Sequence, residues 1–543
     1  MPGTAVLVGP YGKSTSFINT LDWSLCIVAD RVSPEFTLNH AEWPPVRQMR
    51  SEAVHGNLQI GTELQMKIAM VASEVTPFAK TGGLADVLGT LTIALERLGH
   101  EVCIIAPAYR SALRGNFSLR DTRMSLNVPL ADRQEQAAVL EISIGTNVPV
   151  YLIRADPYFD RESLYGTAAG DYPDNAERFI FFSRAALELL RRRPVEIVHC
   201  HDWQTALATV FLNLQPSLYP ETAAAKTVFT IHNLGFQGVF PQSAWPLLKV
   251  DPGYFTPQFL EYYGNINFLK GGLLFADKIT TVSPSYAQEI MTAEQGFGLE
   301  GVLQGRAADL TGILNGVDYH QWNPWTDRYL DCHYGENSLT VKRDCKRTLQ
   351  RAVGLLEKSH TPLLAMISRL TLQKGFDLVE EIFDSLMERD IQIVLLGNGE
   401  PRFERFFQAA AERYQGRVAV EIGFNEPLAH RIEAGADLFL MPSLYEPCGL
   451  NQMFSLKYGT IPVVRAVGGL KDTVQDYDAE SQTGTGFVFD PYDGKALLAA
   501  IDRSLAVFRD KQAWNGLRRR AMAMDYSWGR SAKTYSNLYQ QLS

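Results

Sequence analysis

Short apolar runs alternate with stretches of helical periodicity along most of the chain after residue 65. Residues 66–74 form one apolar run, residues 82–98 carry apolar side chains at helical spacing, and residues 101–109 form the next run. A strand, a helix and a second strand in this order predict a βαβ unit. Further strands and helices of this kind are predicted over residues 148–155, 176–202, 226–233 and 277–290.

A second series of the same type begins near residue 312. Its predicted strands are residues 363–370, 391–399, 418–424, 436–443 and 461–466, and a helical stretch such as 375–389 separates them. Two such series predict an α/β protein with two doubly wound, Rossmann-like domains in tandem. Their shared cleft would face the carboxyl ends of both sets of strands, and residues 311–324 would form the hinge.

Size and charge narrow the function classes. A chain of 543 residues is too long for one core. The 51 basic and 60 acidic residues give a net charge of −9, which argues against a nucleic-acid binder that depends on a global basic field. No apolar run reaches the roughly 18 residues of a membrane span. The six cysteines form no CxxC pair, a usage that fits the reducing cytoplasm.

The first 65 residues differ from the rest. They show little periodicity, and they lack the basic start and apolar core of a signal peptide. Acidic residues such as Asp22 and Glu35 also argue against a transit peptide. We interpret this segment as a disordered extension or as the product of a start codon chosen too far upstream.

Two turns carry a lysine beside a glycine at the start of a predicted helix. Lys80 precedes Gly82 and Gly83, and Lys374 precedes the helix that opens after it. Helix N-termini with glycines admit phosphate groups, and Arg369 adds a second cation near Lys374 that would suit a pyrophosphate. A plain tight turn at residues 80–83, and a solvated basic turn at residues 369–374, remain the alternatives.

Polar residues also end two predicted strands of the first series. His199 and His201 point the same way on a strand and Asp202 follows them, while His232 ends the next strand. Zinc needs three or four ligands, and no second pair stands at suitable spacing, so we expect no metal. Asp202 could bind a sugar hydroxyl, and the strand-end position of His232 favours a place in the cleft.

The stretch SLYEPCGLNQ, residues 443–452, places Glu446 alone in a turn between a strand and a short helix that Gly459 ends. A carboxylate there could accept hydrogen bonds from sugar hydroxyls, and the amides at Gly449 and Leu450 could hold a diphosphate. Cys448 has no histidine or aspartate beside it in sequence to activate it, so we expect packing or ligand contact.

These motifs together resemble the bacterial glycogen synthase and plant starch synthase family. The resemblance runs in order from about residue 66 to the C-terminus. It rests on the motifs KTGGLADV, HCHDWQTAL, TIHNLGFQG, ILNGVD, SRLTLQKGFDL and EPCGLNQMFSLKYGTIPVVRAVGGL. The family implies a GT-B fold, with residues 66–312 on the acceptor side, 313–524 on the nucleotide-sugar donor side, and a helix at about 525–543 that completes the first domain.

The resemblance also implies a reaction and its participants. A glucosyl unit would pass from ADP-glucose to the non-reducing-end 4-hydroxyl of an α-1,4-glucan such as glycogen, with retention of configuration. No cofactor and no metal would be required. The residues implied as catalytic are Glu446, His232, Arg369, Lys374 and Asp202. Those implied to bind the donor are Lys80, Gly82, Gly83, Asn315, Phe424, Cys448, Gly449 and Leu450.

Two other functions remain open from sequence. Another GT-B transferase could use UDP-glucose, because the residues alone do not fix the nucleotide. A catalytically silent glucan-binding protein would share the fold, although the presence of Lys80, Arg369, Lys374 and Glu446 argues against it. Phe424 stands where the family places an aromatic residue, often tyrosine, against adenine, so stacking would survive without a hydroxyl contact.

Overall fold

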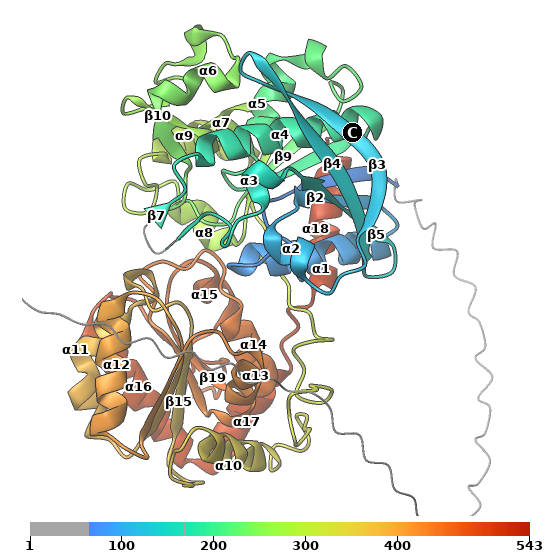
Figure 1. The fold of residues 1–543 in the computed structure, drawn as a ribbon. Helices are drawn as coiled ribbons and strands as arrows, with labels where there is room; N and C mark the ends of the chain where they lie inside the picture. Colours follow the sequence, from blue (N-terminus) through green and yellow to red (C-terminus); the bar gives the residue numbers. More distant parts are fainter. Residues whose placement is uncertain (1–64, 168–169, 543) are drawn as a thin grey trace, which may run out of the picture. The chain divides into compact units, whose positions relative to one another are not determined.

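The first half of the chain is built on a nine-stranded sheet (Figure 1). The computed structural model describes residues 65–167 and 170–542, so the predicted extension lies outside the described residues, except for Gln65. The strand order is β14-β13-β9-β8-β1-β2-β5-β4-β3. The strands are β1 (Lys67–Val71), β2 (Glu101–Pro107), β3 (Arg120–Leu130), β4 (Arg133–Ile144), β5 (Val148–Arg154), β8 (Ile197–His201), β9 (Lys226–Ile231), β13 (Lys278–Thr281) and β14 (Leu310–Gly312).

Helices cover both faces of this sheet. The core on one face includes α4 and α5, and that on the other includes α1 and α18. The helices are α1 (Gly83–Arg97), α2 (Arg110–Arg114), α3 (Asp156–Phe159), α4 (Asn175–Arg192), α5 (Ala206–Leu214), α6 (Trp245–Leu248), α7 (Phe268–Phe275), α8 (Pro284–Glu289) and α9 (Glu300–Gly305). Two small sheets pair β6 (Gly166–Thr167) with β7 (Gly170–Asp171), and β12 (Asn265–Asn267) with β10 (Val239–Pro241) and β11 (Glu261–Tyr262).

The second half has a six-stranded parallel sheet in the order β17-β16-β15-β18-β19-β20. Its strands are β15 (Leu363–Ile367), β16 (Gln392–Gly397), β17 (Val418–Ile422), β18 (Leu438–Met441), β19 (Ile461–Arg465) and β20 (Phe487–Phe489). Its helices are α10 (Lys342–Ala352), α11 (Phe376–Met387), α12 (Pro401–Arg413), α13 (Glu426–Gly435), α14 (Asn451–Tyr458), α15 (Gly468–Thr473), α16 (Gly494–Arg509) and α17 (Lys511–Met522). Separate apolar cores on its two faces complete the doubly wound arrangement, so the α/β fold class is confirmed.

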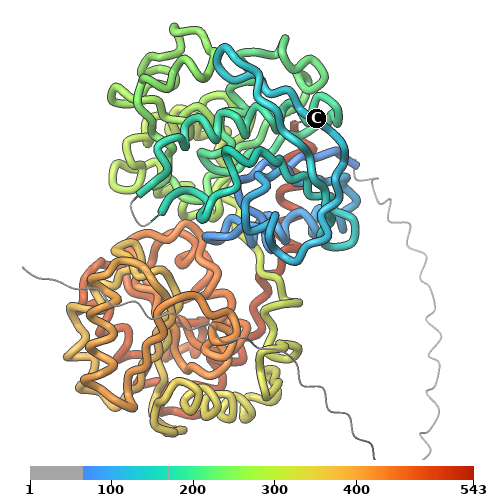
Figure 2. Tube along the Cα trace, viewed as in Figure 1, coloured from blue at the N-terminus to red at the C-terminus, as the bar shows by residue number. Residues whose placement is uncertain are grey.

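The last helix, α18 (Trp528–Gln540), packs against the first half rather than the second. Figures 1 and 2 show it in red beside the blue α1. Trp528, Tyr535 and Tyr539 are buried in the same core as Leu88 and Leu91 of α1. The C-terminal segment therefore supplies part of the first sheet's covering layer.

One element departs from the predicted series of βαβ units. β3 and β4 form an antiparallel hairpin at the sheet edge, and β4 also pairs antiparallel with β5. Every second residue of β3 is largely exposed over much of its length, so its sequence alternates and forms no continuous apolar run. A search for apolar runs misses strands of this kind, because one of their faces meets water.

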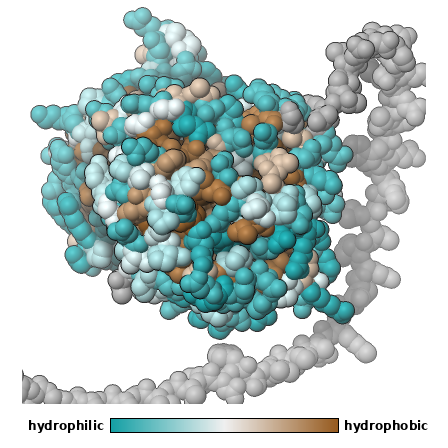
Figure 3. All heavy atoms as spheres, turned by 90° about the horizontal axis from the view of Figure 1, so that it is seen from above, coloured by the Kyte–Doolittle hydropathy of each residue, from teal (hydrophilic) through white to brown (hydrophobic). Residues whose placement is uncertain are grey.

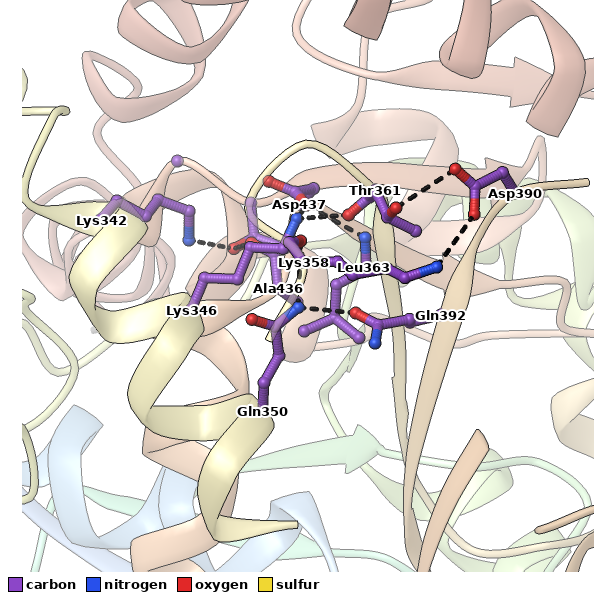
Figure 4. A network of polar contacts seen from close by, with 12 residues as sticks. Lys342, Lys346, Gln350, Lys358, Thr361, Leu363, Asp390, Gln392, Ala436 and Asp437 are labelled. Atoms are coloured by element: carbon purple, nitrogen blue, oxygen red, sulfur yellow. Dashed lines mark hydrogen bonds and ion pairs between the residues drawn. The ribbon is translucent and has the colours of Figure 1, made fainter. Parts of the chain in front are cut away.

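Helix α10 is fastened to the second sheet by buried polar contacts (Figure 4). Lys346 donates to the backbone oxygen of Thr361 at 2.5 Å and to Asp437 Oδ2 at 2.6 Å. Asp437 Oδ2 also accepts from the backbone N–H of Leu363 at 3.0 Å.

Hydrophilic residues dominate the face shown in Figure 3, with separate hydrophobic areas between them. Within the described residues, no helix has the length and apolar character to cross a membrane.

Candidate functional site

The turn that follows β18 holds the carboxylate singled out from the sequence. Glu446 is 5% exposed, and its Oε2 accepts from Lys374 Nζ at 2.6 Å and from Ser443 Oγ at 3.1 Å. Oε1 has no hydrogen-bond partner among the residues that the structure describes. The sequence predicted Glu446 at a strand end and Lys374 just before a helix, and the structure joins them directly, with one carboxylate oxygen left unpaired.

A glycine brings Lys374 close to this turn. Gly375 has φ +75°, and a Cβ there would lie 2.0 Å from the backbone oxygen of Pro442. Only glycine fits both the left-handed backbone and this close approach. Arg369 is exposed, and the one hydrogen bond that its side chain makes within the described chain is a long one of 3.5 Å to Gln373. Its guanidinium is therefore largely available to an anion.

A glycine pair that the sequence analysis did not assign supports the same turn. A Cβ on Gly468 would lie 1.9 Å from the Glu446 backbone oxygen, and one on Gly469 would lie 2.0 Å from that of Cys448. Gly469 donates its N–H to the Glu446 oxygen at 3.1 Å. The adjacent glycines in AVGGL were the available signal, because consecutive glycines often mark a close backbone approach.

Cys448 lies in the interior of this turn. Burial raises the pKa of its thiol to about 12, so the thiol stays protonated and is a poor nucleophile. Its neighbour is Asn315, which is itself 6% exposed. Gly449 follows with φ +71°, and Leu450 directly precedes α14, which ends at Gly459 as predicted. Packing is thus the observed role of the thiol, and the structure brings Asn315 to it.

The first half contributes Asp202 and His232 from adjacent strand ends. Asp202 has φ +56°, and its Oδ1 accepts from the His232 backbone N–H at 2.7 Å. Burial raises the pKa of Asp202 to about 7, against the opposing effect of backbone N–H donors from His232 and Asn233. Burial lowers the pKa of His232 to about 3, so its imidazole is neutral at pH 7. Both residues stand together, as predicted.

Glu74 is a site residue that the sequence analysis missed. It follows β1, is 4% exposed, and accepts from Thr81 N at 2.5 Å and Thr81 Oγ1 at 2.6 Å. Tyr165 donates to Glu74 Oε1 at 2.6 Å from 91 residues away. Glu74 therefore holds the loop that carries Lys80, and no local sequence pattern reveals that contact.

The glycine loop before α1 is open on one side. Lys80 is partly exposed, and its Nζ lies 2.7 Å from Asp86 Oδ1. A Cβ on Gly82 would meet no atom within 4 Å, and one on Gly83 would lie 3.8 Å from Leu450 Cδ1. Gly83 thus faces the residue that precedes α14, which brings the two predicted phosphate-binding loops side by side.

Direct hydrogen bonds join the first half to the Glu446 turn and to the glycine pair that supports it. Ser283 donates to the Pro447 backbone oxygen at 2.6 Å, and Glu289 accepts from Gly468 N at 2.8 Å. The Tyr445 hydroxyl makes a side-chain hydrogen bond with Asn233, the neighbour of His232. These contacts bring the Asp202–His232 edge to the Glu446 turn.

Phe424 follows β17 and is 82% exposed. Asn425 caps the N-terminus of α13 next to it, accepting from Leu428 N at 3.1 Å. An aromatic ring that is open to solvent at a strand end offers a flat surface on which a base can stack. Within residues 65–167 and 170–542, no three His, Cys, Asp or Glu side chains converge as metal ligands would.

Two family profiles match the chain. Residues 67–305 match the starch synthase catalytic domain, and residues 351–514 match the glycosyl transferases group 1 family. A glycogen synthase from Koribacter versatilis is 47% identical over 480 residues, covering 88% of this chain and 98% of that protein. A glycogen synthase from Anaeromyxobacter sp. (strain Fw109-5) is 49% identical over 482 residues, covering 88% of this chain and all of that protein.

Solved structures give the same result. The catalytic domain of starch synthase IV from Arabidopsis thaliana, bound to ADP and acarbose, superposes with a TM-score of 0.82 at 34% identity. The match covers 88% of this chain and 99% of that one. The sucrose-phosphate synthase from Thermosynechococcus elongatus, with a TM-score of 0.56 at 18% identity, shares the fold alone.

Proposed function

Because this chain belongs to the glycogen synthase family of glycosyltransferases, we propose that it transfers glucosyl units from ADP-glucose to an α-1,4-glucan. The acceptor atom is the 4-hydroxyl at the non-reducing end, and the anomeric configuration is retained. The observation that carries the proposal is the Lys374–Glu446 pair, which lies at the carboxyl end of β18 with one carboxylate oxygen unused. Ligands of doubly wound sheets bind at that edge.

The charges at the site fit the bond that must break. Cleavage of the anomeric bond leaves positive charge on the sugar and negative charge on the departing diphosphate. Arg369 and Lys374 supply cations for the diphosphate, and Lys374 keeps two N–H donors beyond the one that it gives to Glu446. Charges fixed in place before the reaction stabilise such a transition state, and losing one costs about 10²–10³ in kcat.

The sugar would lie between Glu446 and the Asp202–His232 edge. Glu446 Oε1 accepts from glucosyl hydroxyls, and the neutral imidazole of His232 faces the same ligand. The Cys448 thiol is buried and protonated, so it is a poor covalent nucleophile. We therefore assign retention to attack on the same face as the leaving group, with the diphosphate oxygen taking the acceptor proton.

Lys80, Gly82 and Gly83 would meet the diphosphate from the first half. The Gly82 position has no neighbour within 4 Å of a Cβ, so its backbone is free to approach a phosphate. Phe424 would stack on the adenine. The starch synthase IV catalytic domain was solved with ADP bound, which supports the nucleotide. Balancing the diphosphate with side-chain cations removes the need for a metal.

We place the reaction in the cytoplasm. The five cysteines in the described part of the chain are free thiols, as a reducing compartment maintains them. The bacterial glycogen synthases that the chain resembles over 88% of its length support the same assignment.

The deciding experiment measures diphosphate release from ADP-glucose and from UDP-glucose, with and without glycogen. The expected result is glycogen-dependent ADP release that Glu446→Ala lowers about 10²–10³-fold. Asp476→Asn is the control, because Asp476 is a partly exposed carboxylate whose side-chain hydrogen bonds go to Arg503 and to the Val488 backbone N–H. Diphosphate release from UDP-glucose but not from ADP-glucose would show that the proposed donor is wrong. Retained glycogen binding with no release from either donor would identify a catalytically silent glucan-binding protein.

A further inference from the structure

Three imidazoles and a thioether form a buried row beneath the sugar side of the site. His201 ends β8 and is fully buried, as is Met70 on the neighbouring β1. His201 Nδ1 lies 3.0 Å from His232 Nε2, and His201 Nε2 lies 3.5 Å from Met70 Sδ. These contacts link residues 131 and 31 positions apart, so the fold alone creates the row.

The chemistry of the groups fixes which nitrogen carries hydrogen. A thioether sulfur has lone pairs and no hydrogen, so Met70 can only accept, and His201 Nε2 must be the donor. Burial holds the pKa of His201 well below its usual value, so the ring is neutral and has a single N–H. Its Nδ1 is therefore a lone pair. Only an N–H on His232 Nε2 can complete the 3.0 Å contact.

The same reasoning extends to the outer end of the row. His232 is also neutral at pH 7, because burial lowers its pKa to about 3. With its hydrogen on Nε2, its Nδ1 carries a lone pair. Among the residues that the structure describes, Nδ1 has no hydrogen-bond partner, and His232 is half-buried at the strand end beside Asp202. The row thus presents an acceptor, not a donor, to a ligand.

A second histidine ring packs against His201. His199 stacks on it with centroids 4.2 Å apart and planes at 30°. His199 is held at both nitrogens, by Tyr539 OH at 2.8 Å and Thr230 Oγ1 at 2.6 Å. Tyr539 belongs to α18, so the helix that returns to the first half anchors the stack. The His201 ring keeps Nε2 at the sulfur and Nδ1 at His232.

We propose that Met70 and His201 are positioning residues that fix the tautomer of His232, so that His232 Nδ1 accepts a hydroxyl hydrogen of the transferred glucosyl unit. This inference rests on the proposed function for its ligand. The polarity matters because a lone pair at Nδ1 can only accept, so the sugar hydroxyl must donate there, whereas the opposite tautomer would require the hydroxyl to accept. The row selects a sugar that donates at this position.

The tautomer can be observed without turnover. In protein labelled with ¹⁵N at histidine, long-range ¹H–¹⁵N correlations distinguish Nε2–H from Nδ1–H rings, and His201→Asn and His232→Asn samples assign the two signals. We expect both native rings in the Nε2–H form. Met70→Leu keeps the side-chain volume but removes the acceptor, so both rings should become tautomer mixtures. Native Nδ1–H rings, or no change in Met70→Leu, would overturn the proposal.

Met66→Leu is the matched control for that exchange. Met66 is fully buried directly before β1, and its backbone N–H donates to His100 Nδ1 at 3.3 Å. Met66→Leu therefore makes the same exchange at a buried methionine that is not part of the row. A tautomer shift in Met66→Leu equal to that in Met70→Leu would show general repacking and would overturn the proposal.

Donor analogues test the polarity of the acceptor. A panel of ADP-glucose analogues carries hydrogen or fluorine in place of one sugar hydroxyl at a time; fluorine accepts weakly and cannot donate. At one position, both replacements should lower kcat/KM about tenfold or more in the native enzyme. In Met70→Leu the fluoro analogue should recover relative to the deoxy analogue, because part of the population then donates from Nδ1.

Two His201 variants separate positioning from folding. In His201→Asn, Oδ1 replaces Nδ1 as the acceptor, whereas His201→Leu provides none. We expect the native analogue pattern in the asparagine variant and its loss in the leucine variant. Equal patterns in both would overturn the proposal. If native protein shows no transfer from ADP-glucose, the proposed function is wrong. The tautomer measurement still tests independently whether Met70 and His201 set the tautomer of His232.

Discussion

Two buried lysine–carboxylate pairs lie at opposite ends of one strand, and they differ in what surrounds them. Asp437 directly precedes β18 and accepts from Lys346 at 2.6 Å; Glu446 follows β18 and accepts from Lys374, also at 2.6 Å. The chemistry and the distance are the same. Position along the strand is what distinguishes them.

At the start of β18, both members of the ion pair make further hydrogen bonds within the protein. The Lys346 side chain is 3% exposed and also donates to a backbone oxygen, and Asp437 also accepts from the start of β15. At the other end, the Lys374 side chain is 19% exposed and bonds only to Glu446 within the described chain. The first pair therefore fastens a helix to the sheet, and the second keeps unused donors and acceptors for a ligand.

The largest contrast is expected from removing the two carboxylates. Glu446→Ala should lower kcat for glucosyl transfer about 10²–10³-fold, because in the proposed function this carboxylate would face the charge that develops on the sugar. Asp437→Ala should leave kcat of the folded protein nearly unchanged and lower its melting temperature. Steady-state ADP release and thermal unfolding of both variants measure this contrast. If Asp437→Ala is fully folded and still loses most of its kcat, the pair before β18 is not purely structural and the contrast drawn here is wrong.

Removing the lysines should give a smaller contrast in the same direction. Lys374→Met should lower kcat about 10²-fold, because one of the two cations proposed to face the diphosphate is lost while the exposed Arg369 remains. Lys346→Met leaves Asp437 unpaired in the interior, which costs about 3–5 kcal/mol of unfolding free energy. Urea unfolding and ADP release should show opposite rankings of the two variants. Identical rankings would mean that both pairs are structural.

Glycine exchanges test whether the geometry at the carboxyl end matters. Gly375→Ala should lower kcat about tenfold, because a Cβ there would lie 2.0 Å from the Pro442 oxygen and push Lys374 away from Glu446. Gly354 has nearly the same φ, +74°, with nothing within 4 Å of a Cβ. Gly354→Ala therefore carries only the backbone strain, of about 1 kcal/mol, and should keep native kcat. Equal kcat in both would show that Lys374 tolerates displacement.

The sequence predicted elements well where the signal is local. The apolar runs and helical spacing identified the strands and helices around Glu446, and Gly459 ends α14 as expected, with φ +64°. Strand-end and turn positions singled out Lys374, Glu446, Asp202 and His232, and the structure brings Lys374 to Glu446 and Asp202 to His232. Local pattern and motif position are sufficient for these features.

Contacts between segments far apart in the sequence could not be predicted from the sequence. Lys374 and Glu446 are 72 residues apart, and Glu74 and Tyr165 are 91 apart, so no spacing rule pairs them. The hairpin of β3 and β4 was missed because its half-exposed strands alternate rather than form apolar runs. Cys448 and Asn315 show the same limit, since only packing reveals that they bury each other.

The smallest effect is expected at Phe424, and it tests whether the ligand site extends from the carboxyl end of β18 to that of β17. Phe424 lies at the carboxyl end of β17, and stacking on a base is worth about 0.5–1.5 kcal/mol, so Phe424→Ala should raise KM for ADP-glucose about threefold to tenfold at constant kcat. Trp325→Ala removes another exposed ring, 64% exposed, and should change neither constant. Phe424→Tyr should match native protein, because the ring face is kept. A fall in kcat with unchanged KM would instead place Phe424 near the reacting atoms and redraw the boundary between nucleotide and sugar.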